Sequence, residues 1–332
     1  MRTSDNIQFI DLFCGIGGIR LGMEEAGFQC VFSCDINEDC QRNYFENFRE
    51  VPNGDIKAID EKSVPEHQIL CAGFPCQPFS ISGRQKGFAD TRGTLFFEIC
   101  RIIQEKNPPV IMLENVKHLV HHDHGNTLAT IISSLEKLGY TVKSKILNAT
   151  DFGVPQNRER ILIIGSKNGK AFDFSKILTK PKTGLEDFLD SASDDSFEFL
   201  SKDSYTLIEN PKRQPSGLIF AGYRNKSIRK VGVREGTEHL SRVHKQPNRI
   251  YSVLGVHPTL PSQEPSGRYF ILLKDGRVRK LTLSECWRIM GFPETYKKIS
   301  STAEQYKQLG NSVCVPMIAA VAEQIKEQFF GA

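Results

Sequence analysis

IQFIDLFCGIGGIRLGMEEAG, residues 7–27, places an apolar run, a glycine-rich turn and a helical pattern in immediate succession. The run at 7–13 is typical of a buried strand, and residues 18–27 have helical spacing that ends in glycine. Glycines between the two let a ligand approach the backbone at the N-terminus of the helix. This stretch therefore predicts the first strand–helix unit of an α/β fold, with a binding site at its turn.

The same alternation continues along the first half of the chain. Further apolar runs predict strands at 29–35, 68–74, 110–115, 141–149 and 160–166. Helical patterns occur at 94–106 and 126–139, and again at 282–291 and 315–330. Strands that alternate with helices predict a mostly parallel sheet with helices on both faces. A length of 332 residues exceeds what one compact domain usually holds, so we expect a second, smaller lobe.

The composition is that of an ordinary globular protein, with 39% hydrophobic and 25% charged residues. The sequence contains no run of about 18 apolar residues, and its N-terminus lacks the apolar core of a signal peptide. Nine cysteines without a CxxC pair fit a reducing compartment. We therefore expect a cytoplasmic protein with no membrane contact.

Basic residues are concentrated in one segment. Residues 211–250 contain ten lysines and arginines against two acids, with Tyr223, His239 and His244 among them. A solvated surface would explain each base singly. The imbalance over forty residues favours a polyanion-binding face.

The glycine turn does not fit a dinucleotide site. Counting GxGxxG from Gly15 puts Arg20 where the third glycine should be, which disfavours a nicotinamide dehydrogenase. Asp35 ends the second predicted strand and Asp55 follows a short third segment, and an acid in such a place can hold ribose hydroxyls. An adenosine ligand without a pyrophosphate, such as S-adenosylmethionine, fits this pattern. A tight turn with ordinary caps fits it equally well.

GFPCQPFS, residues 73–80, brackets a cysteine with two prolines. Pro75 and Pro78 each fix their own φ and favour an extended conformation in the residue before them. The result is a stiff loop that aims Cys76 in one direction. A buried structural thiol does not need such aiming, so the pattern favours a nucleophile.

Five motifs in this order resemble the DNA cytosine-5 methyltransferases of bacterial restriction–modification systems: DLFCGIGG, GFPCQPFS, LENV, QNRERI and LGNSV. The similarity runs from Phe9 to about Gly165 and resumes from about Arg279. It implies a Rossmann-like S-adenosylmethionine-dependent methyltransferase fold with a smaller irregular target-recognition lobe. Residues 1–180 and 305–332 would form the catalytic, cofactor-binding lobe, and residues 181–304 the target-recognition lobe and hinge. Duplex DNA would lie between the lobes.

The resemblance also implies catalytic residues. Cytosine C5 is a poor nucleophile, and a thiolate that adds to C6 makes it reactive. Cys76 would supply this thiolate to a base flipped out of the duplex. Glu114 would donate a proton to N3, and Arg158 and Arg160 would line the active site.

The cofactor residues that the resemblance implies come from the strand ends and the C-terminal segment. They are Phe13, Gly15, Gly17, Asp35, Ile36, Asp55, Ile56, Pro75, Leu95 and Asn311. Ile36 is a departure, because related enzymes often have an aromatic residue there to stack on adenine.

DNA contacts are expected from two regions. The loop after Cys76 is expected to act as a mobile lid that closes on the DNA backbone. It would contribute Ser80, Arg84, Lys86 and Arg92. The second lobe would contribute Arg229, Lys230, Arg242, Arg249, Thr259, Leu260, Gln263 and Arg268. The Thr259–Leu260 pair resembles the recognition-lobe marker of the family.

Three alternatives to a DNA methyltransferase remain at this stage: a tRNA cytosine-5 methyltransferase, a non-catalytic DNA-binding module and, less favoured, the dehydrogenase. The HHDHG stretch, residues 121–125, precedes a helix start, and a polar loop explains it better than a metal site. We expect no metal and a monomeric protein.

Overall fold

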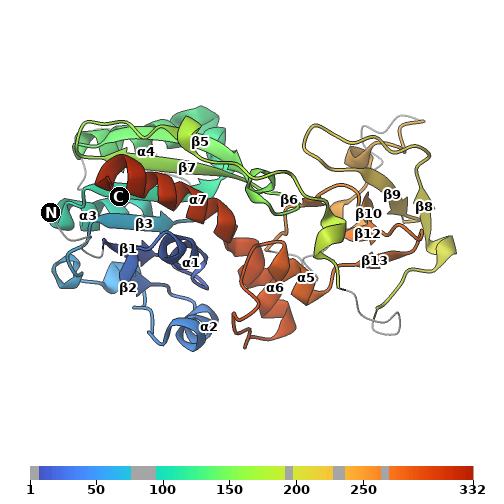
Figure 1. Ribbon diagram of the computed structural model, residues 1–332, viewed down its shortest axis with the longest axis horizontal. Helices are drawn as coiled ribbons and strands as arrows, with labels where there is room; N and C mark the ends of the chain where they lie inside the picture. Colours follow the sequence, from blue (N-terminus) through green and yellow to red (C-terminus); the bar gives the residue numbers. More distant parts are fainter. Residues whose placement is uncertain (1–6, 76–94, 191–196, 227–235, 263–268, 332) are drawn as a thin grey trace.

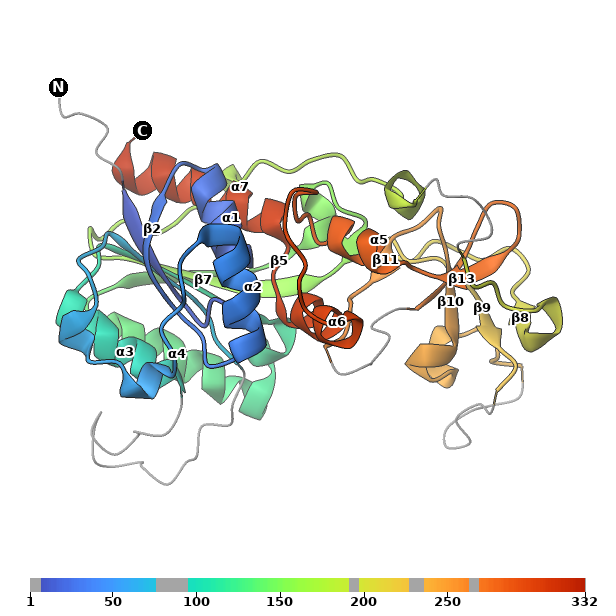
Figure 2. The ribbon, with the colours of Figure 1, turned by 90° about the horizontal axis from the view of Figure 1, so that it is seen from below.

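The computed structural model describes residues 7–75, 95–190, 197–226, 236–262 and 269–331. A larger lobe is built on one sheet and a smaller lobe on another, with helices α5 and α6 between them in both views (Figures 1 and 2). The larger lobe contains both ends of the described chain (Figure 1).

The large sheet has six strands in the order β2-β1-β3-β4-β7-β5. Their bounds are Gln29–Cys34 (β2), Gln8–Leu12 (β1), Ile69–Gly73 (β3), Val110–Val116 (β4), Glu159–Ser166 (β7) and Thr141–Asn148 (β5). Neighbours from β2 to β4 are parallel, whereas β7 is antiparallel to both β4 and β5. The predicted α/β class with a mostly parallel sheet is confirmed, and each of the six strands was expected from its apolar run.

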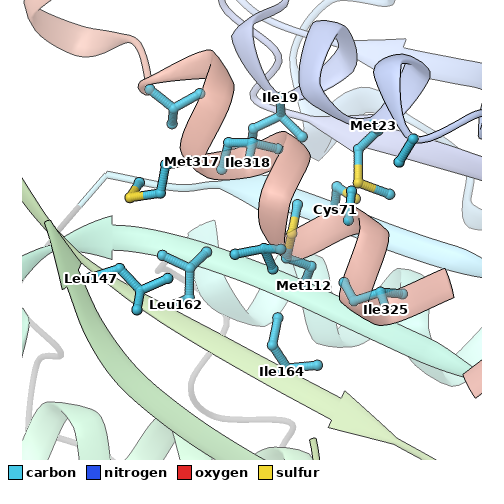
Figure 3. Close-up of a cluster of buried hydrophobic side chains, with 14 of the residues drawn as sticks. Ile19, Met23, Cys71, Met112, Leu147, Leu162, Ile164, Met317, Ile318 and Ile325 are labelled. Atoms are coloured by element: carbon cyan, nitrogen blue, oxygen red, sulfur yellow. The ribbon is translucent and has the colours of Figure 1, made fainter. Parts of the chain in front are cut away.

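Helices cover both faces of this sheet because successive strand residues point to opposite sides. In β3, Ile69 and Cys71 pack toward α1 (Gly18–Glu25) and α7 (Val315–Ile325), as Figure 3 shows for Cys71. Leu70 and Ala72 pack toward α3 (Leu95–Lys106) and α4 (Asn126–Lys137). The apolar runs in these strands are continuous because both faces are buried.

Helices α1 and α7 are in close contact. A Cβ on Gly22 would lie 2.7 Å from Ile318 and 2.8 Å from the Ala319 nitrogen, so only glycine fits at this crossing. The contact fastens the C-terminal helix to the first strand–helix unit.

The smaller lobe contains a five-stranded sheet in the order β13-β12-β10-β9-β8. The strands are Val278–Lys280 (β13), Phe270–Leu272 (β12), Arg249–Ser252 (β10), Phe220–Arg224 (β9) and Tyr205–Leu207 (β8). Each is three to five residues long, which is too short for a clear alternating pattern. The lobe is therefore more regular than the sequence suggested.

Between the sheets lies a third packing centre. Helices α5 (Leu283–Arg288) and α6 (Thr302–Asn311) pack there around the buried Trp287 and Tyr306, in contact with Ile16 from the glycine turn. A short parallel pair, β6 (Gln156–Asn157) with β11 (His257–Pro258), also joins the two regions. The expected boundary at residue 304 falls inside α6.

The remaining elements are helix α2 (Glu38–Phe48) and short helical turns. The turns are Ile56–Ala58, Glu61–Ser63, Lys117–Val120, His122–Gly125, Ala149–Phe152, Phe174–Lys176, Leu185–Phe188, Lys202–Ser204, Ser241–Val243 and Gln246–Asn248, with a π-helical end at Lys326–Phe330. Within the described ranges, no helix is long and apolar enough to span a bilayer.

Candidate active site

A cavity of about 800 Å³ opens where the carboxyl ends of β1 to β4 meet. Its wall is completed by residues 259–262 and by residues from the end of α6 to Val313. In an open α/β sheet this edge is where ligands bind. The cavity joins the glycine turn at one end to Glu114 and Arg160 at the other.

The glycine turn has open space beside its backbone. Gly15 has φ +53°, and a Cβ placed on it would have no atom within 4 Å. The preceding Phe13 also has a positive φ, 59°, which is uncommon for a non-glycine residue and is found at functional sites. Both residues line the cavity, as predicted.

Asp35 supports this turn from the end of β2. Its carboxylate accepts backbone N–H groups from Gly15 and Asn37, each at 2.8 Å. Burial raises the pKa of Asp35, and the two N–H groups partly oppose this shift. Asp55 caps the short helical turn Ile56–Ala58, since its carboxylate accepts the N–H of Lys57 at 3.0 Å. These hydrogen bonds leave each carboxylate oxygen able to accept a second hydrogen bond.

Most of the other predicted cofactor residues also line the cavity, namely Ile36, Asp55, Ile56, Pro75, Leu95 and Asn311. Ile36 is 70% exposed at the rim. Gly17 is an exception. A Cβ on it would lie 2.3 Å from the ring of Phe48, so its role is to let α2 pack against the turn. Asn37 and Ser312 also line the cavity, although neither was predicted from the motifs.

Glu114 and Arg160 form a buried pair at the other end. Glu114 lies on β4, opposite Gly73 of β3, and is 8% exposed. Its Oε1 is 3.0 Å from Nε of Arg160, which reaches across from the antiparallel β7. Burial raises the pKa of Glu114, and Arg160 and then Arg158 only partly oppose it. A carboxyl group with a raised pKa is suited to donating a proton.

Arg158 corrects one expectation. Arg158 is not among the described residues that line the cavity, and its side chain is fully buried (0% exposed). Its guanidinium donates to the carbonyl groups of Leu260 at 3.3 Å, of Gly310 at 2.8 Å, and of Ser312. Of the two arginines in QNRER, only Arg160 lines the cavity, and Arg158 lies between β6 and β7.

The segment that leads to Cys76 starts beside Glu114. The amide of Asn115 donates to the carbonyl of Phe74 at 2.8 Å, and Phe74 and Pro75 line the cavity. Cys76 itself lies outside the described residues. So do the other predicted residues Ser80, Arg84, Lys86, Arg92, Arg229, Lys230, Gln263 and Arg268.

Comparison with known proteins decides the family. Residues 7–327 match the C-5 cytosine-specific DNA methylase family. The chain is 41% identical over 329 residues to the type II methyltransferase M.HhaI of Haemophilus parahaemolyticus, covering 96% of this chain and 94% of that protein. It is 42% identical over 313 residues to M.HaeII of Haemophilus aegyptius, covering 94% and 91%.

The chain belongs to the C-5 cytosine-specific DNA methylase family. It is a DNA cytosine-5 methyltransferase of the type II kind, which confirms the resemblance found in its motifs. Two solved structures share the fold. The Dnmt2 methyltransferase of S. pombe superposes with a TM-score of 0.68 at 19% identity, over 97% of this chain and 99% of that one. A putative DNA modification methyltransferase from an E. coli prophage gives 0.68 at 20%, over the same shares.

Of the DNA contacts expected from the methyltransferase's second lobe, four lie in the described ranges. Arg242 is exposed, and Arg249 donates from Nε to the carbonyl of His244 at 3.1 Å. Thr259 lines the cavity and donates its hydroxyl to the carbonyl of Asn157 at 2.6 Å. Leu260 is 2% exposed within the packing centre of α5 and α6, so its side chain offers little surface to DNA.

The HHDHG stretch also has a local explanation. Nδ1 of His122 is 2.7 Å from the hydroxyl of Thr127 in α4. Within the described residues, no group of three histidine, cysteine or acidic side chains is arranged to hold a metal ion.

Proposed function

We propose that this methyltransferase transfers a methyl group from S-adenosylmethionine to C5 of cytosine in a specific short duplex DNA site. Catalysis would proceed through addition of Cys76 to C6 of a flipped-out base. The observation that carries the proposal is that the glycine turn and the Glu114–Arg160 pair line one continuous cavity. A cofactor and a base can therefore meet inside it.

The cofactor end fits an adenosine ligand. There is open space in front of Gly15. The carboxylates of Asp35 and Asp55 would accept ribose hydroxyls, and the apolar side chains of Ile36 and Leu95 would contact the adenine ring. Asn311 would close the site from the end of α6. When bound, S-adenosylmethionine supplies an electrophilic methyl group.

The base would enter at the opposite end. A base inside a duplex is not accessible from both ring faces, so it must leave the stack. The thiolate of Cys76 would form a bond to C6, and the C5–C6 π electrons would become available at C5. Glu114 would donate its proton to N3, which keeps the ring neutral. Arg160 would then pair with the Glu114 carboxylate and would contact O2 of the base.

The final step restores the aromatic ring. After C5 has gained the methyl group, a base removes the C5 proton. The electrons of that C–H bond re-form the C5–C6 double bond, and the bond between C6 and Cys76 breaks. N3 returns its proton to the Glu114 carboxylate, so the methylated base leaves neutral. The thiolate is thereby regenerated for the next turnover.

The two lobes would have different functions. We assign catalysis to residues 1–180 and 305–332, and target recognition to residues 181–304. Base contacts would come from the second lobe and phosphate contacts from both lobes. We further propose that the enzyme acts in the cytoplasm as a monomer and without a metal.

A labelled methyl donor tests the proposal. The enzyme is incubated with methyl-labelled S-adenosylmethionine and with either duplex DNA or tRNA. We expect label at cytosine C5 in duplex DNA, at one short recurring site. Label confined to tRNA would support the alternative substrate and contradict the proposal.

A further inference from the structure

Three consecutive residues near the start of β7 hold the Thr259–Leu260 segment. Both backbone polar groups of Leu260 are bonded: its N–H donates to Oε1 of Gln156 at 3.2 Å, and its carbonyl accepts from Arg158 at 3.3 Å. The hydroxyl of Thr259 donates to the carbonyl of Asn157 at 2.6 Å. These bonds continue the parallel pairing of β6 with β11.

The same arginine also holds the segment around Asn311. Its NH2 group donates to the carbonyl of Gly310 at 2.8 Å and to that of Ser312, on either side of Asn311. The two segments touch directly as well. A Cβ on Gly310 would lie 2.5 Å from the Cα of Ser262, so the chain after Leu260 runs against this glycine.

The hydrogen bonds of Arg158 tie the two segments to each other. Arg158 is fully buried, and a buried charge without partners would cost several kcal/mol. Its carbonyl bonds are charge-assisted, hence stronger than neutral ones. If either segment moved by an ångström or more, the guanidinium would lose acceptors that water cannot replace at this depth. The positions of the two segments are therefore linked.

We propose that Arg158 is a positioning residue that couples cofactor binding to DNA binding. Contact of the cofactor with Asn311 fixes the carbonyls of Gly310 and Ser312, and Arg158 transmits this order to Leu260 and Thr259 at the DNA side. The inference rests on the function proposed above. Coupling of this kind is reciprocal, so each ligand strengthens the binding of the other by the same factor.

The test compares DNA affinity with and without a cofactor analogue. Fluorescence anisotropy gives the Kd for a labelled duplex that contains the mapped target site, with and without saturating S-adenosylhomocysteine. We expect the analogue to strengthen binding by about 5-fold or more in the wild-type enzyme. In Arg158→Lys, which keeps the charge but cannot reach all three carbonyls, the ratio should fall to within about 2-fold of unity, since the link between the segments is then broken.

A matched control separates coupling from general damage. Arg279 is another buried arginine, paired with Glu285 at 2.8 Å in the second lobe, and Arg279→Lys should keep the wild-type ratio. A merely structural role for Arg158 would weaken both affinities and leave their ratio unchanged. If thermal melting shows that Arg158→Lys does not fold, the variant Thr259→Val replaces it in the test. This variant removes one hydrogen bond of the same junction, so it should lower the ratio of the Kd values measured without and with the analogue.

The outcomes distinguish two failures. If the wild-type enzyme binds no S-adenosylhomocysteine, the proposed cofactor is wrong. If it binds both ligands but shows no coupling, or if the variant at Arg158 retains the full ratio, the role assigned to Arg158 is wrong and the proposed function stands.

Discussion

Replacing Glu114 with glutamine removes a proton donor while keeping the size of the side chain. Glu114 is 8% exposed and 3.0 Å from Arg160, and a carboxamide oxygen can still accept from that guanidinium. The fold should survive with a loss of about 1–3 kcal/mol in the free energy of unfolding. The rate of methyl transfer should fall by about 10²–10⁴-fold, or roughly 2.7–5.4 kcal/mol of barrier.

The raised pKa of Glu114 also predicts how the rate of methyl transfer changes with pH. Burial raises the pKa of Glu114, so the protonated donor persists to a higher pH than for an exposed glutamate and is lost as the pH rises through that pKa. The wild-type rate should therefore decline on the alkaline side. A glutamine side chain does not titrate, so the variant Glu114→Gln should lack this decline.

Single-turnover methyl transfer, followed with labelled cofactor and excess enzyme, measures the chemical step without product release. Glu159→Gln is the matched control, because Glu159 neighbours Arg160 but pairs with Lys117 at 2.8 Å on the surface. The control should retain wild-type rates. A Glu114→Gln variant that works within about threefold of the wild type, or that shows the same alkaline decline, would refute the assigned role.

Three further predictions concern the cofactor turn, a buried carboxyl group and the second lobe. Asp35→Ala removes the acceptor for the N–H of Gly15 in the turn and for that of Asn37, and calorimetry should show S-adenosylhomocysteine binding about 10–100-fold more weakly, with DNA binding in its absence unchanged. Burial raises the pKa of Asp11 from 3.8 to about 8, so folding stability should fall as the pH rises between these values, by up to about 1.4 kcal/mol per pH unit. Urea unfolding at pH 6 and pH 8 measures this loss, and the free energy of unfolding should decline less in Asp11→Asn than in the wild type. Equal declines in the two proteins would contradict this pKa. Exchange of residues 182–274 for those of a relative should transfer that relative's target site and leave the cofactor affinity unchanged. Sequencing of the methylated DNA identifies the site, and an unchanged site would show that the recognition lobe is wrongly assigned.

The large lobe could be predicted because β1, β3, β4 and β7 are buried along almost their whole length and appear in the sequence as apolar runs. The site followed from the strand ends, since Asp35, Pro75 and Glu114 must meet where parallel strands finish. Helix α6 was missed although Ser301 accepts the N–H of Glu304, an S-x-x-E signal that the sequence does contain. Its few apolar residues are spread among polar ones, so the periodic pattern is weak.

The role of Arg158 could not be predicted from spacing. Residues 158 and 160 would share one face if both belonged to a single strand. Strand β7 begins only at Glu159, and Arg158 turns instead toward carbonyl groups 102 to 154 residues away in sequence. Partners at such separations are set by tertiary packing. The same limit applies to the parallel pairing of β10 with β12, which are not consecutive strands.

Covalent addition by Cys76 is the central claim, and a duplex with fluorine at C5 of the target cytosine tests it most directly. The last step must remove a proton from C5, and fluorine cannot leave in its place. The enzyme, S-adenosylmethionine and this duplex should therefore form an enzyme–DNA adduct that survives denaturing electrophoresis. Cys76→Ser should form none. Absence of the adduct with a wild-type enzyme that methylates the unmodified duplex would contradict the covalent mechanism.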